Sequence, residues 1–170
     1  MIFTSHALAG AAIGIVSGNP YAGFASGVIS HHLLDMIPHF DQGTFRLKGS
    51  LAPYINMHSD FNRSKFNGRD WIMLFIDFAI TGVLFLIISA TLPVELWPLV
   101  FCGALGGLAP DLIGTSPLWS DQLEKKFKSA RIYKSFHGFF HFTVSPSLIW
   151  LGVVTQILVI GFSLIIIAGK

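Results

Sequence analysis

The stretch Trp71–Leu92, WIMLFIDFAITGVLFLIISATL, contains a single charged residue, Asp77. A second stretch, Phe142–Gly169, contains no charged residue. A helix needs about 20 predominantly apolar residues to cross the hydrocarbon core of a bilayer, so both stretches are predicted to span a membrane. We expect the other apolar segments, 3–18, 20–37 and 96–113, to cross or enter the membrane as well. The sequence therefore predicts an all-α, polytopic fold with about five membrane-embedded helices.

The composition supports a single membrane domain over residues 1–170. Hydrophobic residues make up 52% of the chain and charged residues only 12%, compared with about 25% charged residues in soluble domains. The net charge is +2. The sequence has no basic stripe with interleaved aromatic residues, so we expect no nucleic-acid partner. Cys102 is the only cysteine, which excludes an internal disulfide. Residues 1–18 lack the basic start of a secretory signal, so we expect them to be mature structure.

Two features of these segments predict how they pack. Gly10 with Gly14, and Gly23 with Gly27, have the small-xxx-small spacing that lets membrane helices approach closely, although glycines at these positions could also simply be tolerated. Between residues 114 and 140, apolar side chains at helical spacing lie beside lysines and an arginine. This pattern predicts an amphipathic helix on the membrane surface.

Charge asymmetry predicts the orientation. If the five segments alternate, the N-terminus and the polar segments 38–70 and 114–140 lie on one side of the membrane. Almost all lysines and arginines fall on that side, and only Lys170 lies opposite. The positive-inside rule makes the basic side cytoplasmic, so the chain is predicted to be a multi-pass membrane protein with its N-terminus in the cytoplasm.

The ionisable residues of the apolar segments all fall at this predicted cytoplasmic side. They are His6, His31, His32, Asp35, His39, Asp77, Asp111, His137 and His141. Each acidic group near hydrocarbon costs a few kcal/mol unless it is paired or coordinated, so a shared partner is the economical explanation. Gly27 to Asp35 and Gly103 to Asp111 also have equal spacing, and this faint internal repeat would bring Asp35 and Asp111 together.

Spacing favours a metal ion as that partner. His31 and Asp35, Asp35 and His39, and His137 and His141 are each four residues apart, so each pair shares a helical face where the helix is regular. Imidazole and carboxylate ligands suit zinc, with manganese or iron as alternatives, and the number of candidates allows one or two ions. The predicted ligands are His6, His31, Asp35, Asp111, His137 and His141. Asp77 or His39 is predicted as the catalytic base or as an outer partner of the ligands.

Other acidic residues have simpler interpretations. Asp41 is expected to be a solvated loop residue, and Asp70 is expected to cap the helix that begins beside Trp71. Asp111 follows Pro110, so a role at a helix end is an alternative for it.

Several short motifs resemble a known family. They are Ser5-His6-Ala7, the run from Ser30 to His39, Ala109-Pro110-Asp111, and His137 with His141. In this order they resemble the membrane-bound metal-dependent hydrolases of the YdjM and YbcI type. The resemblance implies a metal-dependent hydrolase of the bacterial inner membrane. Two departures are that Asp35 lacks the preceding proline and that Phe136-His137-Gly138 replaces the family's Arg-Gly form.

Three functions are compatible with these residues. The first is a hydrolase whose metal ion activates water and polarises a phosphoryl oxygen, acting on a lipid-linked phosphoester among membrane lipids. The second is a transporter of protons or metal ions, since intramembrane carboxylates and histidines also form ion pathways. The third is a structural metal clamp that holds the helices together.

Overall fold

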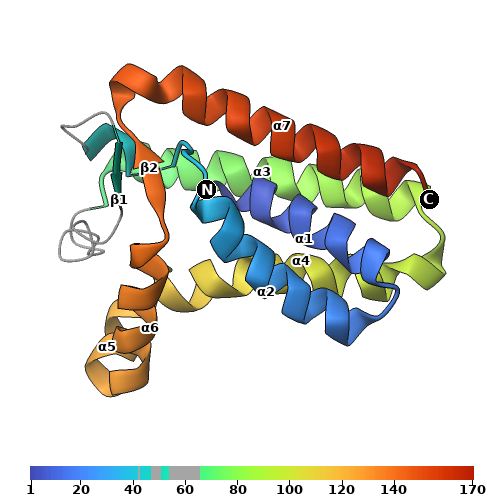
Figure 1. Cartoon of the computed structure of the whole chain (residues 1–170), viewed down its shortest axis with the longest axis horizontal. Coiled ribbons are helices and arrows are strands. Elements are labelled where there is room, and N and C mark those ends of the chain that lie inside the picture. Colours follow the sequence, from blue (N-terminus) through green and yellow to red (C-terminus); the bar gives the residue numbers. More distant parts are fainter. Residues whose placement is uncertain (42, 47–50, 54–65) are drawn as a thin grey trace.

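The structure is a computed structural model that describes residues 1–41, 43–46, 51–53 and 66–170. The α-helices are α1 (Phe3–Ser17), α2 (Pro20–Asp35), α3 (Gly68–Thr91), α4 (Trp97–Gly114), α5 (Ser120–Lys126), α6 (Lys128–Phe139) and α7 (Ile149–Ala168). Two short strands are β1 (Leu51–Pro53) and β2 (Phe142–Val144), and 3-10 helices cover Thr44–Arg46, Val94–Leu96 and Pro146–Leu148. The fold is therefore predominantly helical, as the sequence predicts (Figure 1).

Within the described part of the chain, three helical segments are long and apolar enough to cross a membrane: Gly68–Thr91, Val94–Gly114 and Pro146–Ala168. The prediction of five such segments is therefore met for three of them. Helix α1 is apolar but has only 15 residues, and α2 is not among the apolar candidates because His31, His32 and Asp35 lie in its last turns.

Helix α1 lies at the centre of the bundle and packs against α2, α4, α7 and α3 (Figure 1). Glycines make these contacts close: a Cβ atom added to Gly10 would overlap the backbone of Gly103, and one added to Gly27 would overlap the backbones of Gly103 and Gly107. The glycine pairs therefore serve packing, which decides between the two interpretations that the sequence left open. The buried apolar core of this part includes Leu8, Ala11, Ile15, Val100 and Ala104.

Polar side chains define where two of the helices begin. Asn19 accepts hydrogen bonds from the backbone N–H groups of Tyr21 and Ala22, which starts α2 at Pro20. Asn67 and Asp70 form a capping box at the start of α3, so Asp70 has the capping role that its position predicts.

The predicted amphipathic helix between residues 114 and 140 is in fact two helices. The chain is extended at Phe127 (φ −127°, ψ 123°), which separates α5 from α6. The break turns α6 back along α5, so that the buried Lys134 amine pairs with Glu124. Long lysine side chains on a single straight helix could not make this contact between residues that are ten positions apart.

The last membrane segment also begins later than predicted. Residues Phe142–Val144 pair antiparallel with Leu51–Pro53, and a parallel bridge joins His39 to Thr143. Phenylalanine, threonine and valine favour extended backbone, which explains why the helix α7 starts only at Ile149.

The chain places its termini at opposite ends of the bundle (Figure 1). The N-terminus, the two strands and the helices α5 and α6 share one end, and the C-terminus lies at the other. This is the arrangement that alternating segments predict. Lys48, Arg63 and Lys65, which contribute to the predicted charge asymmetry, lie outside the described residues.

Candidate metal centre

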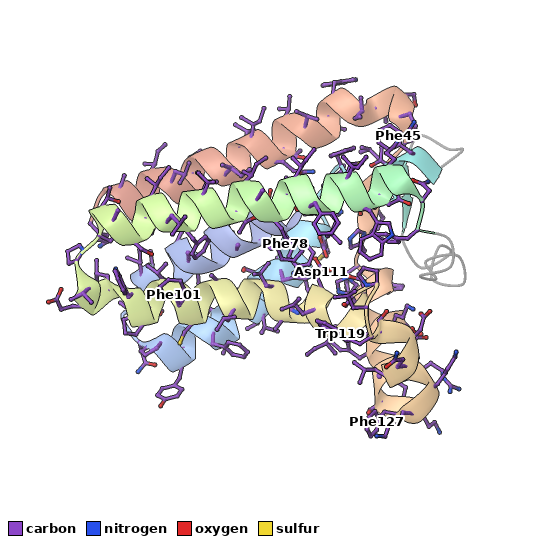
Figure 2. All side chains as sticks on the ribbon, turned by 180° about the vertical axis from the view of Figure 1, so that it is seen from behind. Phe45, Phe78, Phe101, Asp111, Trp119 and Phe127 are labelled. Carbon is purple, nitrogen blue, oxygen red and sulfur yellow. The ribbon has the colours of Figure 1, made fainter. Side chains whose placement is uncertain are left out.

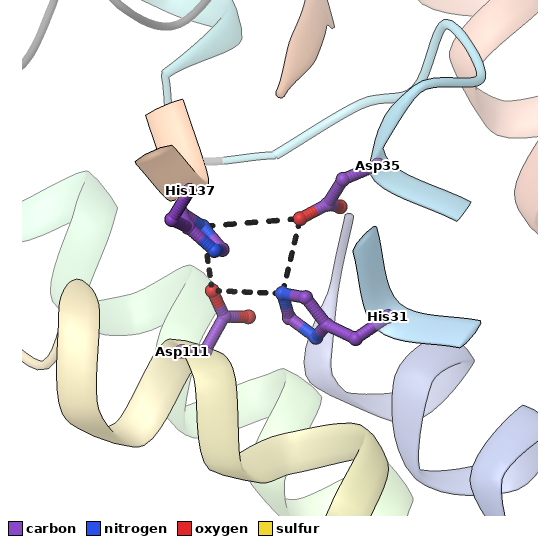
Figure 3. A group of neighbouring side chains, drawn as sticks. All are labelled: His31, Asp35, Asp111 and His137. Atoms are coloured by element: carbon purple, nitrogen blue, oxygen red, sulfur yellow. Dashed lines mark ion pairs between the residues drawn. The ribbon is translucent and has the colours of Figure 1, made fainter. Parts of the chain in front are cut away.

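Three helix ends meet where the N-terminal half of the chain approaches α6. The last turns of α2 provide His31 and Asp35, the end of α4 provides Asp111, and the end of α6 provides His137 (Figure 3). The equal spacing of Gly27 to Asp35 and Gly103 to Asp111 is accompanied by close contact of α2 with α4. Both aspartates consequently lie beside the same imidazole, that of His31.

These four side chains form the first group. His31 Nε2 lies 3.1 Å from Asp35 Oδ2 and 3.7 Å from Asp111 Oδ1. His137 Nε2 lies 3.8 Å from Asp35 Oδ2 and 3.5 Å from Asp111 Oδ1 (Figure 3). Ligand atoms at the corners of a tetrahedron around zinc are about 3.4 Å apart, given metal–ligand bonds of about 2.0–2.2 Å. The four printed distances are close to this spacing, and all four ligand atoms lie within 4.8 Å of one another, near enough to hold one ion.

The hydrogen bonds of His31 show why a cation fits. His31 Nδ1 lies 2.7 Å from the carbonyl oxygen of Gly107, and a carbonyl only accepts, so Nδ1 carries the proton. In the neutral ring, Nε2 then presents a lone pair to two carboxylate oxygens. Among the described residues, His31 Nε2, Asp35 Oδ2 and both ring nitrogens of His137 are buried and make no hydrogen bond. Converging, buried acceptors of this kind are stabilised by a cation placed between them.

The histidines from the segment after α4 are in the form that binds metal. Burial lowers the pKa of His137 to about 4, and burial also lowers the pKa of His141. Both imidazoles are therefore neutral near pH 7, which is the state required of a metal ligand.

A second group shares Asp35 with the first. Asp35, His39 and His141 are all buried, and their ligand atoms lie close enough to hold one ion. Asp35 Oδ1 is 3.8 Å from His39 Nε2, and Asp35 Oδ2 is 3.7 Å from His141 Nε2. Asp41 Oδ2 adds a carboxylate oxygen 3.5 Å from each of these two nitrogens. The positively charged Met1 amine lies here, 2.7 Å from Asp35 Oδ1 and 2.8 Å from His39 Nε2.

Hydrogen bonds also orient the rings of the second group. His39 Nδ1 lies 2.8 Å from the carbonyl oxygen of Ile37 and donates to it. Thr143 Oγ1 donates to Asp41 Oδ2 and lies 3.2 Å from His141 Nδ1, so this nitrogen donates to the hydroxyl. Both Nε2 atoms are thereby left as acceptors that face Asp35.

Tertiary structure, and not helix periodicity, places His39 and His141. Helix α2 ends at Asp35 and α6 ends at Phe139, so neither histidine continues the face of a helix as the four-residue spacing suggests. The bridge between His39 and Thr143 instead brings both histidines to Asp35. His39 Nε2, predicted as a base, is thus also a candidate ligand.

Two predicted site residues lie beside the groups. His6 Nε2 hydrogen-bonds to Asp35 Oδ1 at 3.1 Å, and its ring stacks on that of His31 with centroids 3.8 Å apart. His6 is therefore positioned to orient the carboxylate of Asp35. Asp77 belongs to neither group: its carboxylate accepts hydrogen bonds from the backbone N–H groups of Phe3 and Thr4 and from the Thr4 hydroxyl, so it caps the start of α1.

Sequence reasoning missed Asp41, for which it predicted a solvated loop position. The side chain is only 3% exposed and lies against His39, His141 and Thr143. The sequence around Asp41 carries no local signal of this burial, because it depends on the bridge between His39 and the distant Thr143.

A comparison with known protein families, curated proteins and solved structures found no match to this chain.

Proposed function

We propose that this protein is an integral-membrane, metal-dependent hydrolase that acts on a lipid-linked phosphoester at the cytoplasmic face. The observation that carries the proposal is the first group, in which buried histidine and aspartate atoms without hydrogen bonds converge from three helices. The motif order that resembles the YdjM and YbcI type of hydrolase supports the same activity.

The donor set favours zinc, with manganese or iron as alternatives, because imidazole and carboxylate ligands suit all three. Two histidines and two aspartates could hold an ion in the first group, and hydrolysis requires that this ion keep a coordination position open for water. The second group provides Asp35, His39 and His141, with Asp41 beside them. Since Asp35 belongs to both groups, we propose two ions with Asp35 as the shared ligand, the second of which would displace the Met1 amine from Asp35 Oδ1.

A bound divalent cation would polarise a phosphoryl oxygen and lower the pKa of water. The chain's own residues position the reaction. His31 and His137 are held with acceptor nitrogens directed at Asp35 and Asp111. Where only the first group holds an ion, His39 Nε2 is the better candidate for the proton acceptor, because the carboxylate of Asp77 is already engaged by the start of α1. As a ligand of a second ion, His39 Nε2 could not accept a proton.

The same proposal places all five apolar segments in the membrane. Helix α1 is surrounded by α2, α3, α4 and α7, so it can lie at bilayer depth without being long enough to cross the membrane by itself. The basic residues of α5 and α6 make the end that carries the site the cytoplasmic one. There they would attract a phosphate headgroup.

A structural clamp is the second candidate. Its supporting observation is that the ligands of the first group come from α2, α4 and α6, so that one ion would tie three helices together. Transport has less support, because the described core towards the opposite end consists of Leu8, Ile15, Ile88 and other apolar side chains.

One experiment separates these functions. The full-length protein is purified, its metal content is measured by mass spectrometry, and phosphate release from phosphatidic acid and farnesyl phosphate is followed with and without a chelator. Metal with chelator-sensitive phosphate release supports the hydrolase. Metal without release, combined with a lower melting temperature after chelation, supports the clamp. Metal flux in proteoliposomes without phosphate release supports transport.

A further inference from the structure

A pocket adjoins the metal centre between the cytoplasmic ends of α3 and α4. Asp41, Asp111 and His141 line it on the side of the two groups, together with Met1. The remaining wall is mainly apolar and includes Phe3, Leu74, Phe78, Leu112, Leu118 and Trp119. Figure 2 shows Phe78 on α3 facing the region of Asp111, with Trp119 beyond the end of α4. The cavity volume is about 90 Å³, below the range of typical small-molecule sites, so an occupant would have to extend through the open mouth along the rim.

The polar groups of this wall already have partners. Thr115 Oγ1 donates to the backbone oxygen and to Oδ1 of Asp111, each at 3.2 Å. Trp119 Nε1 donates to the carbonyl oxygen of Leu112 at 2.6 Å, and Ser116 Oγ accepts from the N–H of Leu118 at 3.3 Å. Apolar surface therefore begins directly beside the ligand carboxylate of Asp111.

Exposure increases from the inner wall to the rim. Leu74 is 8% exposed, whereas Phe78 is 45% and Leu118 50% exposed. The rim residue Phe78 lies on a helix that can cross the membrane, and Leu118 follows another. An apolar chain could therefore pass from the bilayer along the rim into the pocket without crossing water.

We propose that this pocket binds the hydrocarbon chain of a single-chain phosphate ester, such as an alkyl or isoprenyl phosphate, and presents its phosphate to the metal centre. The proposal rests on the proposed function and names its substrate class. In such a molecule the hydrocarbon starts at the phosphate oxygen, which matches a wall that is apolar from Asp111 outward. A two-chain glycerolipid instead places carbonyl esters between phosphate and chains, and burying these without hydrogen bonds is unfavourable.

Binding is measured first, independently of turnover. Trp119 is retained as the only tryptophan through Trp71→Phe, Trp97→Phe and Trp150→Phe, and its fluorescence is titrated with a brominated alkyl phosphate. We expect saturable quenching. The matched control retains only Trp97, at the opposite end of α4, and should show no saturable quenching. Quenching that is equal for both proteins, or equally strong with a brominated two-chain phosphatidic acid, would overturn the proposal.

Turnover is measured second. Phe78→Gln should lower kcat/KM for farnesyl phosphate about ten-fold, because the ring loses its contact with the chain, and should lower kcat/KM for a short, water-soluble alkyl phosphate much less. Leu86→Gln, an equally polar change at a 72% exposed position of α3, should leave both unchanged. An equal loss on both substrates in Phe78→Gln would count against the pocket. Saturable quenching of Trp119 with no phosphate release from any ester would overturn the hydrolase and support the pocket as a binding site.

Discussion

Asp35 is the residue on which both metal-binding groups depend. Its carboxylate is 1% exposed and lies within 4 Å of His6, His31, His39, His137 and His141. No other described carboxylate belongs to both groups. A single substitution at this position therefore tests both groups together.

Asp35→Asn should reduce metal affinity at least about 100-fold, since even the loss of an outer partner of a ligand weakens binding 10–100-fold. Bound metal per protein is measured by mass spectrometry after dialysis against a metal buffer. Glu95→Gln, the same type of change at an exposed site at the opposite end, should retain its metal. Unchanged metal content in Asp35→Asn would contradict both groups as metal sites.

Asp77→Asn tests a different role. Replacing one carboxylate oxygen by an amide N–H donor disrupts the cap on α1, and we expect a loss of about 1–3 kcal/mol in the free energy of unfolding. Metal content should not change. A variant with normal thermal stability and strongly reduced phosphate release would instead identify Asp77 as the catalytic base.

The sequence predicts many of the individual residues of the site. His31, Asp35, Asp111 and His137 were all expected to gather because ionisable residues in apolar segments need partners, and the structure brings these four together. Asp41 could not be predicted in this way, since its burial depends on the pairing of residues 39–41 with the distant Thr143. The capping role of Asp77 likewise depends on a contact between two helices.

Close backbone contact between helices fixes the elements that carry these residues. Gly103 lies against Gly10 and Gly14, and Gly107 lies against the backbone of His6. The small-xxx-small spacing predicts that such contacts form, but it does not identify the partner helix. Gly10, Gly14 and Gly27 pack on α4, whereas Gly23 packs against Gly14 of α1. Likewise, the break at Phe127 has no local signal such as proline.

Gly103→Val should separate α1 from α4 and lower the free energy of unfolding by about 3 kcal/mol or more, because backbone lies where the side chain would go. The melting temperature in detergent, with and without added zinc, measures the effect. Gly82→Val on α3 is the matched control, since no described atom lies within 4 Å of its added Cβ. Equal melting temperatures for the two variants would contradict the close contact.

For the whole molecule, the arrangement of the ends carries the functional proposal. The strands, α5 and α6 lie at the end that carries the metal-binding groups, and the C-terminus lies at the other (Figure 1). Exposed lysines of α5 and α6 lie at that end, including Lys125, Lys126 and Lys128. Charge asymmetry predicts that this end faces the cytoplasm.

Cysteine labelling in intact bacterial cells tests this orientation. In a Cys102→Ser background, Glu95→Cys should react with a membrane-impermeant maleimide added outside, and Lys126→Cys should react only after the cells are permeabilised. Both positions are exposed, so differences in burial do not explain a difference in labelling. The reverse pattern would place the metal centre in the periplasm.

The hydrogen bonds that join His39 to Phe142 and Val144 have a consequence for biogenesis. A nascent chain delivers α1, α2 and α4 to the insertion machinery before it delivers His137 and His141. Asp35 therefore lies among apolar helices without these two histidines until the final third of the protein has been translated. Ion capture is consequently a late step of assembly, and a chain that stalls after α4 would have neither metal-binding group complete, a feature by which membrane proteases could distinguish it from the finished protein.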